Sequence, residues 1–88
     1  MSAYLDGNAL AGMLGEVFAV DVTAASGQCA ACGRTGVIAQ ARAYLDAPGA
    51  VARCPACGQV LLRLVRGPGR AWLDLRGLTC LEIEVPGP

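Results

Sequence analysis

The chain has 88 residues and a formal net charge of zero, and 55% of its residues are hydrophobic. This length suits one domain whose apolar burial alone gives only marginal stability. With this balance of charges the chain is not a strongly basic domain of the kind that binds nucleic acid, although residues 34–76 hold all seven arginines. No stretch reaches the roughly 18 apolar residues of a membrane span, and the N-terminus lacks the basic region of a secretory signal. We therefore expect a cytoplasmic protein without membrane contact.

The first expected element is an amphipathic α-helix over residues 5–19. Its apolar residues recur at the spacing of one helix face: Leu10, Met13, Leu14, Val17 and Phe18. Asp6 or Asn8 is placed to cap its start. Gly12 and Gly15 each lower the helix propensity by about 1 kcal/mol relative to alanine, so contacts with the rest of the domain must hold this helix.

Two cysteine pairs organise the rest of the chain. Each has two residues between its thiols and a glycine after the second thiol: Cys29-Ala30-Ala31-Cys32-Gly33 and Cys54-Pro55-Ala56-Cys57-Gly58. A tight turn of this length lets both sulfurs face one point, and two such turns supply the four thiolates of a closed structural zinc site. The 21 residues between the pairs lie within one residue of the usual zinc spacing. The predicted ligands of one Zn²⁺ ion are Cys29, Cys32, Cys54 and Cys57.

The remaining elements are expected to be antiparallel β-strands. A short strand at residues 20–23 leads into the first cysteine turn, and the alternation of side chains predicts further strands at residues 37–45, 50–53, 60–66, 70–76 and 79–85. Asp46-Ala47-Pro48-Gly49 supplies a turn that makes a hairpin between the two pairs. We expect one domain over residues 1–88, with a ribbon at 20–66 that holds the metal site and a C-terminal hairpin at 67–88.

The double cysteine turn with its intervening hairpin resembles the zinc-ribbon class over about residues 20–66. The whole chain is similar to an uncharacterised family of small bacterial double-CxxC proteins, through Tyr4-Leu5-Asp6-Gly7-Asn8-Ala9-Leu10 and Arg66-Gly67-Pro68-Gly69-Arg70-Ala71-Trp72-Leu73-Asp74-Leu75-Arg76-Gly77. The ribbon resemblance implies zinc ligation by the four paired cysteines, and the family resemblance implies a shared fold without a known activity. The expected class is a small α+β, mainly β fold, in which a zinc ribbon of antiparallel β-hairpins with two CxxC knuckles is preceded by one amphipathic α-helix.

Other uses of the paired cysteines remain open. Both turns also resemble rubredoxin knuckles, in which four thiolates hold iron (Fe) for electron transfer. The chain has only one tryptophan, two tyrosines and one phenylalanine, fewer than the aromatic core of a rubredoxin would need. A thioredoxin-like thiol exchanger would require a βαβ context around one pair, and two disulfides would require an oxidising compartment. Zinc is therefore the expected metal and iron the alternative.

Four residues outside the pairs have both a structural and a functional interpretation. Arg34 and Arg53 stand beside cysteines, where their charge could offset that of the thiolates, or they could be solvated strand ends. Trp72 is expected to cover the apolar layer, with an exposed stacking platform as the alternative. Cys80 is expected to be a small buried or half-buried side chain, with a reactive thiol as the alternative.

The sequence favours a non-catalytic protein. It contains no histidine to serve as a general base, and four thiolates would leave a zinc ion no open position for a water molecule. We expect an interaction module or small accessory subunit that binds another protein or a second copy of itself. Nucleic-acid binding through the arginine-rich centre is the alternative.

Overall fold

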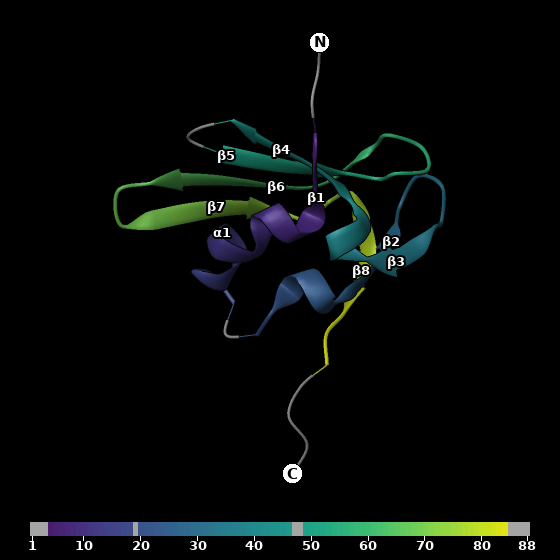
Figure 1. Ribbon diagram of the computed structural model, residues 1–88, viewed down its shortest axis with the longest axis horizontal. Coiled ribbons are helices and arrows are strands. Elements are labelled where there is room, and N and C mark those ends of the chain that lie inside the picture. Colours follow the sequence, from purple (N-terminus) through teal and green to yellow (C-terminus); the bar gives the residue numbers. More distant parts are fainter. Residues whose placement is uncertain (1–3, 19, 47–48, 85–88) are drawn as a thin grey trace.

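The computed structural model describes residues 4–18, 20–46 and 49–84, which form two antiparallel β-sheets (Figure 1). The five-stranded sheet has the order β1 (Leu5–Asp6), β4 (Arg42–Asp46), β5 (Gly49–Arg53), β6 (Val60–Gly67) and β7 (Arg70–Asp74). The three-stranded sheet has the order β3 (Thr35–Val37), β2 (Ser26–Cys29) and β8 (Leu78–Glu82). The predicted class, a small and mainly β fold of antiparallel strands with two CxxC knuckles and one preceding α-helix, is confirmed.

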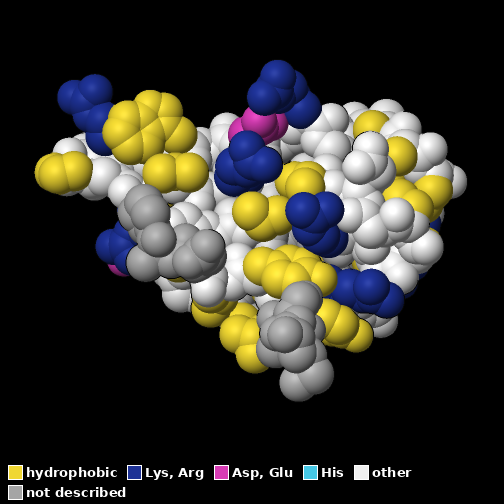
Figure 2. All heavy atoms as spheres, turned by 90° about the horizontal axis from the view of Figure 1, so that it is seen from above, with side chains coloured by type: hydrophobic (Ala, Val, Ile, Leu, Met, Phe, Trp, Pro, Cys, Tyr) yellow, Lys and Arg dark blue, Asp and Glu magenta, His cyan; other side chains and the backbone are white. Residues whose placement is uncertain are grey.

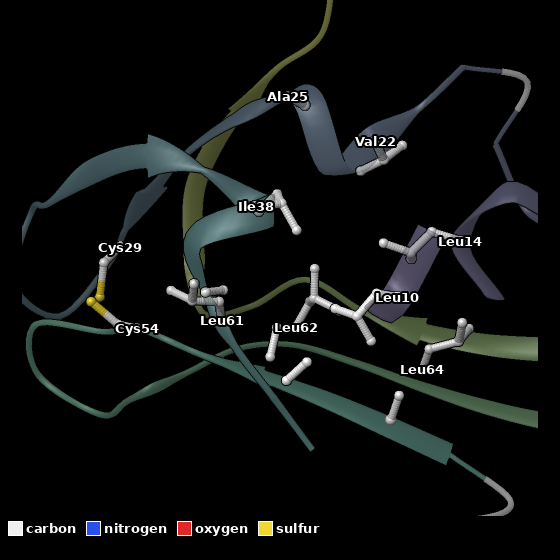
Figure 3. Packing of buried hydrophobic residues seen from close by; sticks show 14 residues of the cluster. Leu10, Leu14, Val22, Ala25, Cys29, Ile38, Cys54, Leu61, Leu62 and Leu64 are labelled. Carbon is white, nitrogen blue, oxygen red and sulfur yellow. The ribbon is translucent and has the colours of Figure 1, made fainter. Parts of the chain in front are cut away.

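Short helices cover the inner face of the five-stranded sheet. They are the α-helix α1 (Ala11–Gly15) and the 3-10 helices η1 (Gly7–Leu10), η2 (Val22–Ala24) and η3 (Ile38–Gln40). Leu10 and Leu14 from this helical layer share one buried cluster with Leu62 and Leu64 of β6 (Figure 3). Alternation along β6 turns these leucines inward and leaves Arg63 between them exposed. The helical layer and this sheet therefore enclose the main core.

The predicted helix over residues 5–19 is too long. The backbone is α-helical only over Ala11–Gly15, and residues 5–6 pair with β4 instead. A Cβ atom on Gly7 would lie 1.7 Å from the carbonyl oxygen of Ile38, so η1 and η3 approach each other too closely for any side chain at this position. Leu10 and Leu14 are buried as the stripe predicts, but Val17 is exposed. Ala19 lies outside the described residues.

The N-terminal cap is confirmed, although it caps a different element. The Asp6 carboxylate accepts a hydrogen bond of 3.0 Å from the Asn8 backbone N–H, at the start of η1 rather than of an α-helix. A second cap overturns the predicted strand at 20–23. The Asp21 carboxylate accepts from the Thr23 backbone N–H at 3.1 Å, and the chain forms η2 there. At Asp21 a local side-chain hydrogen bond thus replaces strand pairing, whereas Asp6 both pairs with Arg42 of β4 and caps η1.

The predicted strand over residues 37–45 is interrupted by η3, and its regular part is β4. This turn of 3-10 helix changes which side chains face the core. Ile38, which belongs to the predicted strand, is 1% exposed, and Ala43 is also buried. The hairpin between the cysteine pairs is confirmed by the β4–β5 register, in which Asp46 stands opposite Gly49. Residues 47–48 of the predicted turn lie outside the described residues.

The predicted C-terminal hairpin is wrong, because β7 and β8 belong to different sheets. Strand β7 pairs with β6, placing Trp72 opposite Val65. Strand β8 pairs with β2, placing Leu81 opposite Gly27. The last strand ends at Glu82, and residues 85–88 of the predicted element lie outside the described residues. The chain's last strand therefore completes the small sheet that its middle began. Among the described residues, no helix has the length and apolar character needed to cross a membrane.

Candidate metal centre

The four predicted metal ligands come together where the two sheets meet. The Sγ atoms of Cys29, Cys32, Cys54 and Cys57 all lie within 4.8 Å of one another. The first pair belongs to the turn between β2 and β3, and the second to the turn between β5 and β6. Each sheet therefore supplies one knuckle, and a bound ion would join the two sheets.

The first knuckle is a tight turn closed by the backbone. The Cys29 N–H donates to the Arg34 carbonyl at 2.9 Å, and the Gly33 N–H donates to the Cys29 carbonyl at 2.9 Å. Gly33 has a φ of 81°, a left-handed conformation that favours glycine. The Gln28 side-chain amide also donates to the Gly33 carbonyl at 3.4 Å. The glycine after the second cysteine is thus required by the shape of the turn.

The second knuckle repeats this arrangement. The Cys54 N–H donates to the Gln59 carbonyl at 2.8 Å, the Gly58 N–H donates to the Cys54 carbonyl at 2.9 Å, and Gly58 also has a φ of 81°. Here the Arg53 guanidinium donates to the Gly58 carbonyl at 2.9 Å. In both knuckles the residue before the first cysteine therefore holds the carbonyl of the glycine.

Two of the sulfur–sulfur distances match those of a tetrahedral site. Across the two knuckles, Cys29 Sγ lies 3.7 Å from Cys57 Sγ, and Cys32 Sγ lies 3.7 Å from Cys54 Sγ. A tetrahedron with metal–sulfur bonds of about 2.3 Å has sulfur–sulfur edges of about 3.8 Å. Cys29 and Cys54 are buried at one end of the core cluster with their sulfur atoms turned toward each other (Figure 3), whereas Cys32 and Cys57 are exposed. The donor set could hold one ion at the protein surface.

The thiols are also arranged to share negative charge. The backbone N–H of Cys32 is the main cause that lowers the pKa of Cys29 to about 7. Burial acts to raise the pKa of Cys54, but hydrogen bonds from the backbone N–H groups of Cys57 and Ala56 and from the thiols of Cys32 and Cys57 together lower that pKa. The Gln59 N–H acts to lower the pKa of Cys57, yet desolvation and the neighbouring cysteines raise it to about 11. Without a cation the cluster therefore loses its first protons readily and its last one with difficulty.

Gly77 links the first knuckle to the chain that follows the second knuckle. Its carbonyl accepts a hydrogen bond of 2.9 Å from the Ala30 backbone N–H. A Cβ atom on Gly77 would lie 1.8 Å from the Val60 carbonyl oxygen and 2.6 Å from Leu61 Cα. The absence of a side chain is what lets these three segments meet beside the sulfur cluster.

The other residues singled out in the sequence have varied outcomes. Arg53 contacts the second knuckle as described, whereas the Arg34 guanidinium donates to the Gln40 side-chain oxygen at 3.2 Å. The predictions that Trp72 covers the apolar layer and that Cys80 is buried or half-buried are wrong, because both side chains are exposed. Trp72 stands opposite Val65 on the outer side of the five-stranded sheet, and Cys80 stands opposite Gln28 in the small sheet.

The sequence analysis missed Gln28 and Gly77. A signal for Gln28 exists, since Gln28 and Arg53 occupy the same position, immediately before the first cysteine of each pair. The role of Gly77 has no local signal, because it depends on which segments the fold brings beside it.

Comparison with known proteins places the chain in a family but adds no activity. No curated protein and no solved structure shows a significant match to it. One family does match, over residues 1–86, and its description is "Family of unknown function (DUF6510)". This match spans both knuckles and both sheets, and the chain belongs to this family.

Proposed function

We propose that the protein is a non-catalytic binding module whose fold is held by one structural zinc ion, with Cys29, Cys32, Cys54 and Cys57 as its ligands. The observation that carries this proposal is the pair of 3.7 Å sulfur–sulfur distances between the two knuckles. These distances match the edges of a tetrahedral four-thiolate site, in which every coordination position belongs to the protein. Such an ion has no position for a reacting water molecule or substrate, so its role is to hold the fold.

The size of the fold supports a structural role for the metal. Zinc binding to a four-ligand site contributes about 10–16 kcal/mol at neutral pH, which is comparable to the whole stability of a small domain, about 5–15 kcal/mol. The described core is made mostly of leucine and alanine side chains. A cross-link between the two sheets would therefore supply a large part of the cohesion. Thiolate ligation also suits a reducing compartment such as the cytoplasm.

Zinc is favoured over iron on the character of the core. The same four thiolates suit either metal. The buried cluster is aliphatic, and Phe18 is the aromatic residue among the partly buried side chains packed against it. Tyr4 and Trp72 are exposed. This arrangement does not surround the metal with the aromatic core that the electron-carrier alternative would lead us to expect.

Metal analysis with an absorption spectrum of natively expressed protein tests the proposal. We expect one zinc per chain, no iron and no visible absorption. One iron per chain with a charge-transfer spectrum would instead establish the electron-carrier alternative.

Thiol titration with an aromatic disulfide reagent separates bound cysteines from free ones. All five cysteines are free of disulfides, and Cys32, Cys57 and Cys80 are exposed. If the metal is bound, only Cys80 should react quickly, and the other four should react after a chelator is added. Cys80→Ser is the matched control, because it should remove the fast-reacting thiol and leave the metal content unchanged. Rapid reaction of Cys32 and Cys57 in freshly purified protein would contradict the proposal.

A further inference from the structure

The outer side of the five-stranded sheet carries most of the arginines of the chain. The register places Arg42 opposite Arg53 and Arg63 opposite Val51, so these side chains lie on the side away from the buried Ala43, Ala52 and Leu62. Along β7, Arg70 and Trp72 share the same side, since Trp72 stands opposite Val65. We define the basic face by its arginines and its two aromatic residues: Arg42, Arg53, Arg63, Arg70, Tyr44 and Trp72. Figure 2 shows this side, with arginine and hydrophobic side chains interspersed across it.

Among the described side chains, none of the four arginines of the basic face forms a salt bridge, although the register places Asp6 opposite Arg42 and Asp74 opposite Arg63. Arg42 and Arg53 stand directly opposite each other, a position at which like charges repel. The Arg42 guanidinium lies 5.0 Å from the centre of the Tyr4 ring, and that of Arg53 lies 5.8 Å from the centre of the Tyr44 ring. Aromatic faces thus hold these cations in place without cancelling their charge.

The carboxylate of Asp74 on this side is already occupied. The Arg76 guanidinium binds it in a two-pronged contact, with Nη2 at 2.7 Å and Nε at 3.0 Å from Oδ2. The same guanidinium holds the pKa of the Asp74 carboxyl at about 2. Arg63 stands opposite Asp74 and also lowers its pKa, so Asp74 binds Arg76 first and offsets only part of the charge of the four arginines that define the face.

The zero net charge of the chain conceals this separation. Glu16 follows α1 and Asp21 precedes η2, both in the layer that covers the inner face of the sheet, and Glu82 belongs to β8 of the other sheet. Arg66 lies on the helical side and pairs with Glu16 at 3.1 Å. Asp6 and Asp74 lie instead on the side of the basic face, where the four arginines outnumber them, so a polyanion would meet mainly arginines there.

From these observations we infer that the basic face binds single-stranded nucleic acid. Its phosphates would contact the four arginines, and its bases would stack on Trp72, which is 56% exposed, and on Tyr44 beside Arg53. A duplex hides the flat faces of its bases, so an exposed aromatic side chain on a sheet favours the single strand. An acidic protein would supply carboxylates but no succession of planar groups. The inference rests on the proposed function in one respect: the fold that the proposed zinc ion holds is what brings the arginines of the basic face together.

Binding is tested with a fluorescein-labelled 20-nucleotide oligothymidylate and the corresponding oligouridylate, by anisotropy on the metal-loaded full chain at increasing salt. We expect binding at low salt and an affinity that falls with a log–log slope of about −0.7 for each phosphate contacted. The chain has one tryptophan, so quenching of its fluorescence on titration with unlabelled oligonucleotide reports stacking on Trp72 directly.

Matched substitutions locate the site. Arg53→Gln with Arg63→Gln should weaken binding roughly tenfold or more and make the salt slope shallower by about 1.4, the loss of two phosphate contacts. Arg66→Gln removes the same type of charge from the opposite side and should leave the affinity within about twofold. Trp72→Ala should weaken binding by roughly 5- to 100-fold. Val17→Ala, at another exposed apolar residue, is its control.

Besides the dimerisation described below, four results would overturn the inference: no binding at low salt, an effect of Arg66→Gln as large as that of Arg53→Gln with Arg63→Gln, tighter binding of a 20-base-pair duplex, or equally effective competition by polyglutamate. The last would identify an acidic protein as the partner of this face. Oligonucleotide-independent dimerisation in size-exclusion chromatography that is abolished by Trp72→Ala would assign the face to a second copy of the chain. Metal content and thermal transition are measured for each variant. If a variant loses nucleic-acid binding but keeps its metal content and thermal transition, the substitution has affected the basic face itself. If the metal and the thermal transition are lost as well, the result tests the proposed zinc site instead.

Discussion

The two knuckles have the same local geometry but different surroundings. In each, the first cysteine N–H reaches a carbonyl five residues later, and a glycine with a φ of 81° follows the second cysteine. The first knuckle belongs to β2, the central strand of the small sheet, and is tied to Gly77 through the Ala30 N–H. The second lies between two strands of the large sheet. The residues within each knuckle therefore determine the shape of its turn, whereas the fold determines which strands and segments each turn contacts.

The largest effects should come from removing one ligand of either knuckle. Cys29→Ser and Cys54→Ser each remove a buried thiolate. We expect both to lose the metal and most of the folding free energy, because the metal contributes about as much as the whole stability of such a domain. Metal content and the thermal transition measure this. If Cys54→Ser unfolds but Cys29→Ser keeps a cooperative transition, the two sheets do not depend equally on the metal.

Gly77→Ala should come next. Its new Cβ atom would meet the Val60 carbonyl oxygen and Leu61 Cα, both backbone atoms, so the segments beside the cluster must move apart. We expect a loss of roughly 3 kcal/mol in the free energy of unfolding, with metal still bound. Denaturant unfolding of the metal-loaded protein measures it. Gly12→Ala is the control, since its Cβ meets nothing within 4 Å and should stabilise α1 by about 1 kcal/mol.

Substitution of the knuckle glycines tests whether the two turns are equivalent. Gly33→Ala and Gly58→Ala both force alanine into a left-handed conformation with open space around it. Each should cost about 1–2 kcal/mol, and asparagine should cost less because its side chain tolerates this conformation. The free energies of unfolding of the four variants give the comparison. A difference of more than about 1 kcal/mol between the two alanine variants would show that the knuckles are not equivalent.

The smallest effect concerns the residue before each knuckle. Arg53→Met removes a 2.9 Å hydrogen bond to the Gly58 carbonyl, whereas Gln28→Met removes one of 3.4 Å to the Gly33 carbonyl. Both hydrogen bonds are exposed to solvent. We therefore expect Arg53→Met to lower the free energy of unfolding by about 0.5 kcal/mol and Gln28→Met to lower it by less. Metal dissociation rates in the presence of a chelator should rise in the same order. A faster release from Gln28→Met would contradict this ranking.

The cysteine cluster was predictable because its signal is local. Two thiols separated by two residues, with a glycine after them, define a turn that needs little help from the rest of the fold. The confirmed hairpin between β4 and β5 is local in the same sense. Both features depend on residues close together in the chain.

The errors concern contacts between distant residues. The predicted helix fails because Gly7 must pack against the carbonyl of Ile38, a contact between residues 31 positions apart. The last strand pairs with β2 rather than with its neighbour β7, and nothing in the alternation of Leu81 and Glu82 specifies a partner strand. The arginine-rich centre was visible as a charge imbalance, but a basic face requires the register of four strands.

The pairing of β2 with β8 has a consequence for the order in which the protein is made. All four cysteines of the cluster have been synthesised once residue 57 has been added, whereas the small sheet needs residues 78–82 for its third strand. A ribosome adding about 5–20 residues per second makes this last strand one to a few seconds later. During that interval the nascent chain already holds every thiol needed to capture a metal ion, while one edge of β2 still awaits its partner strand.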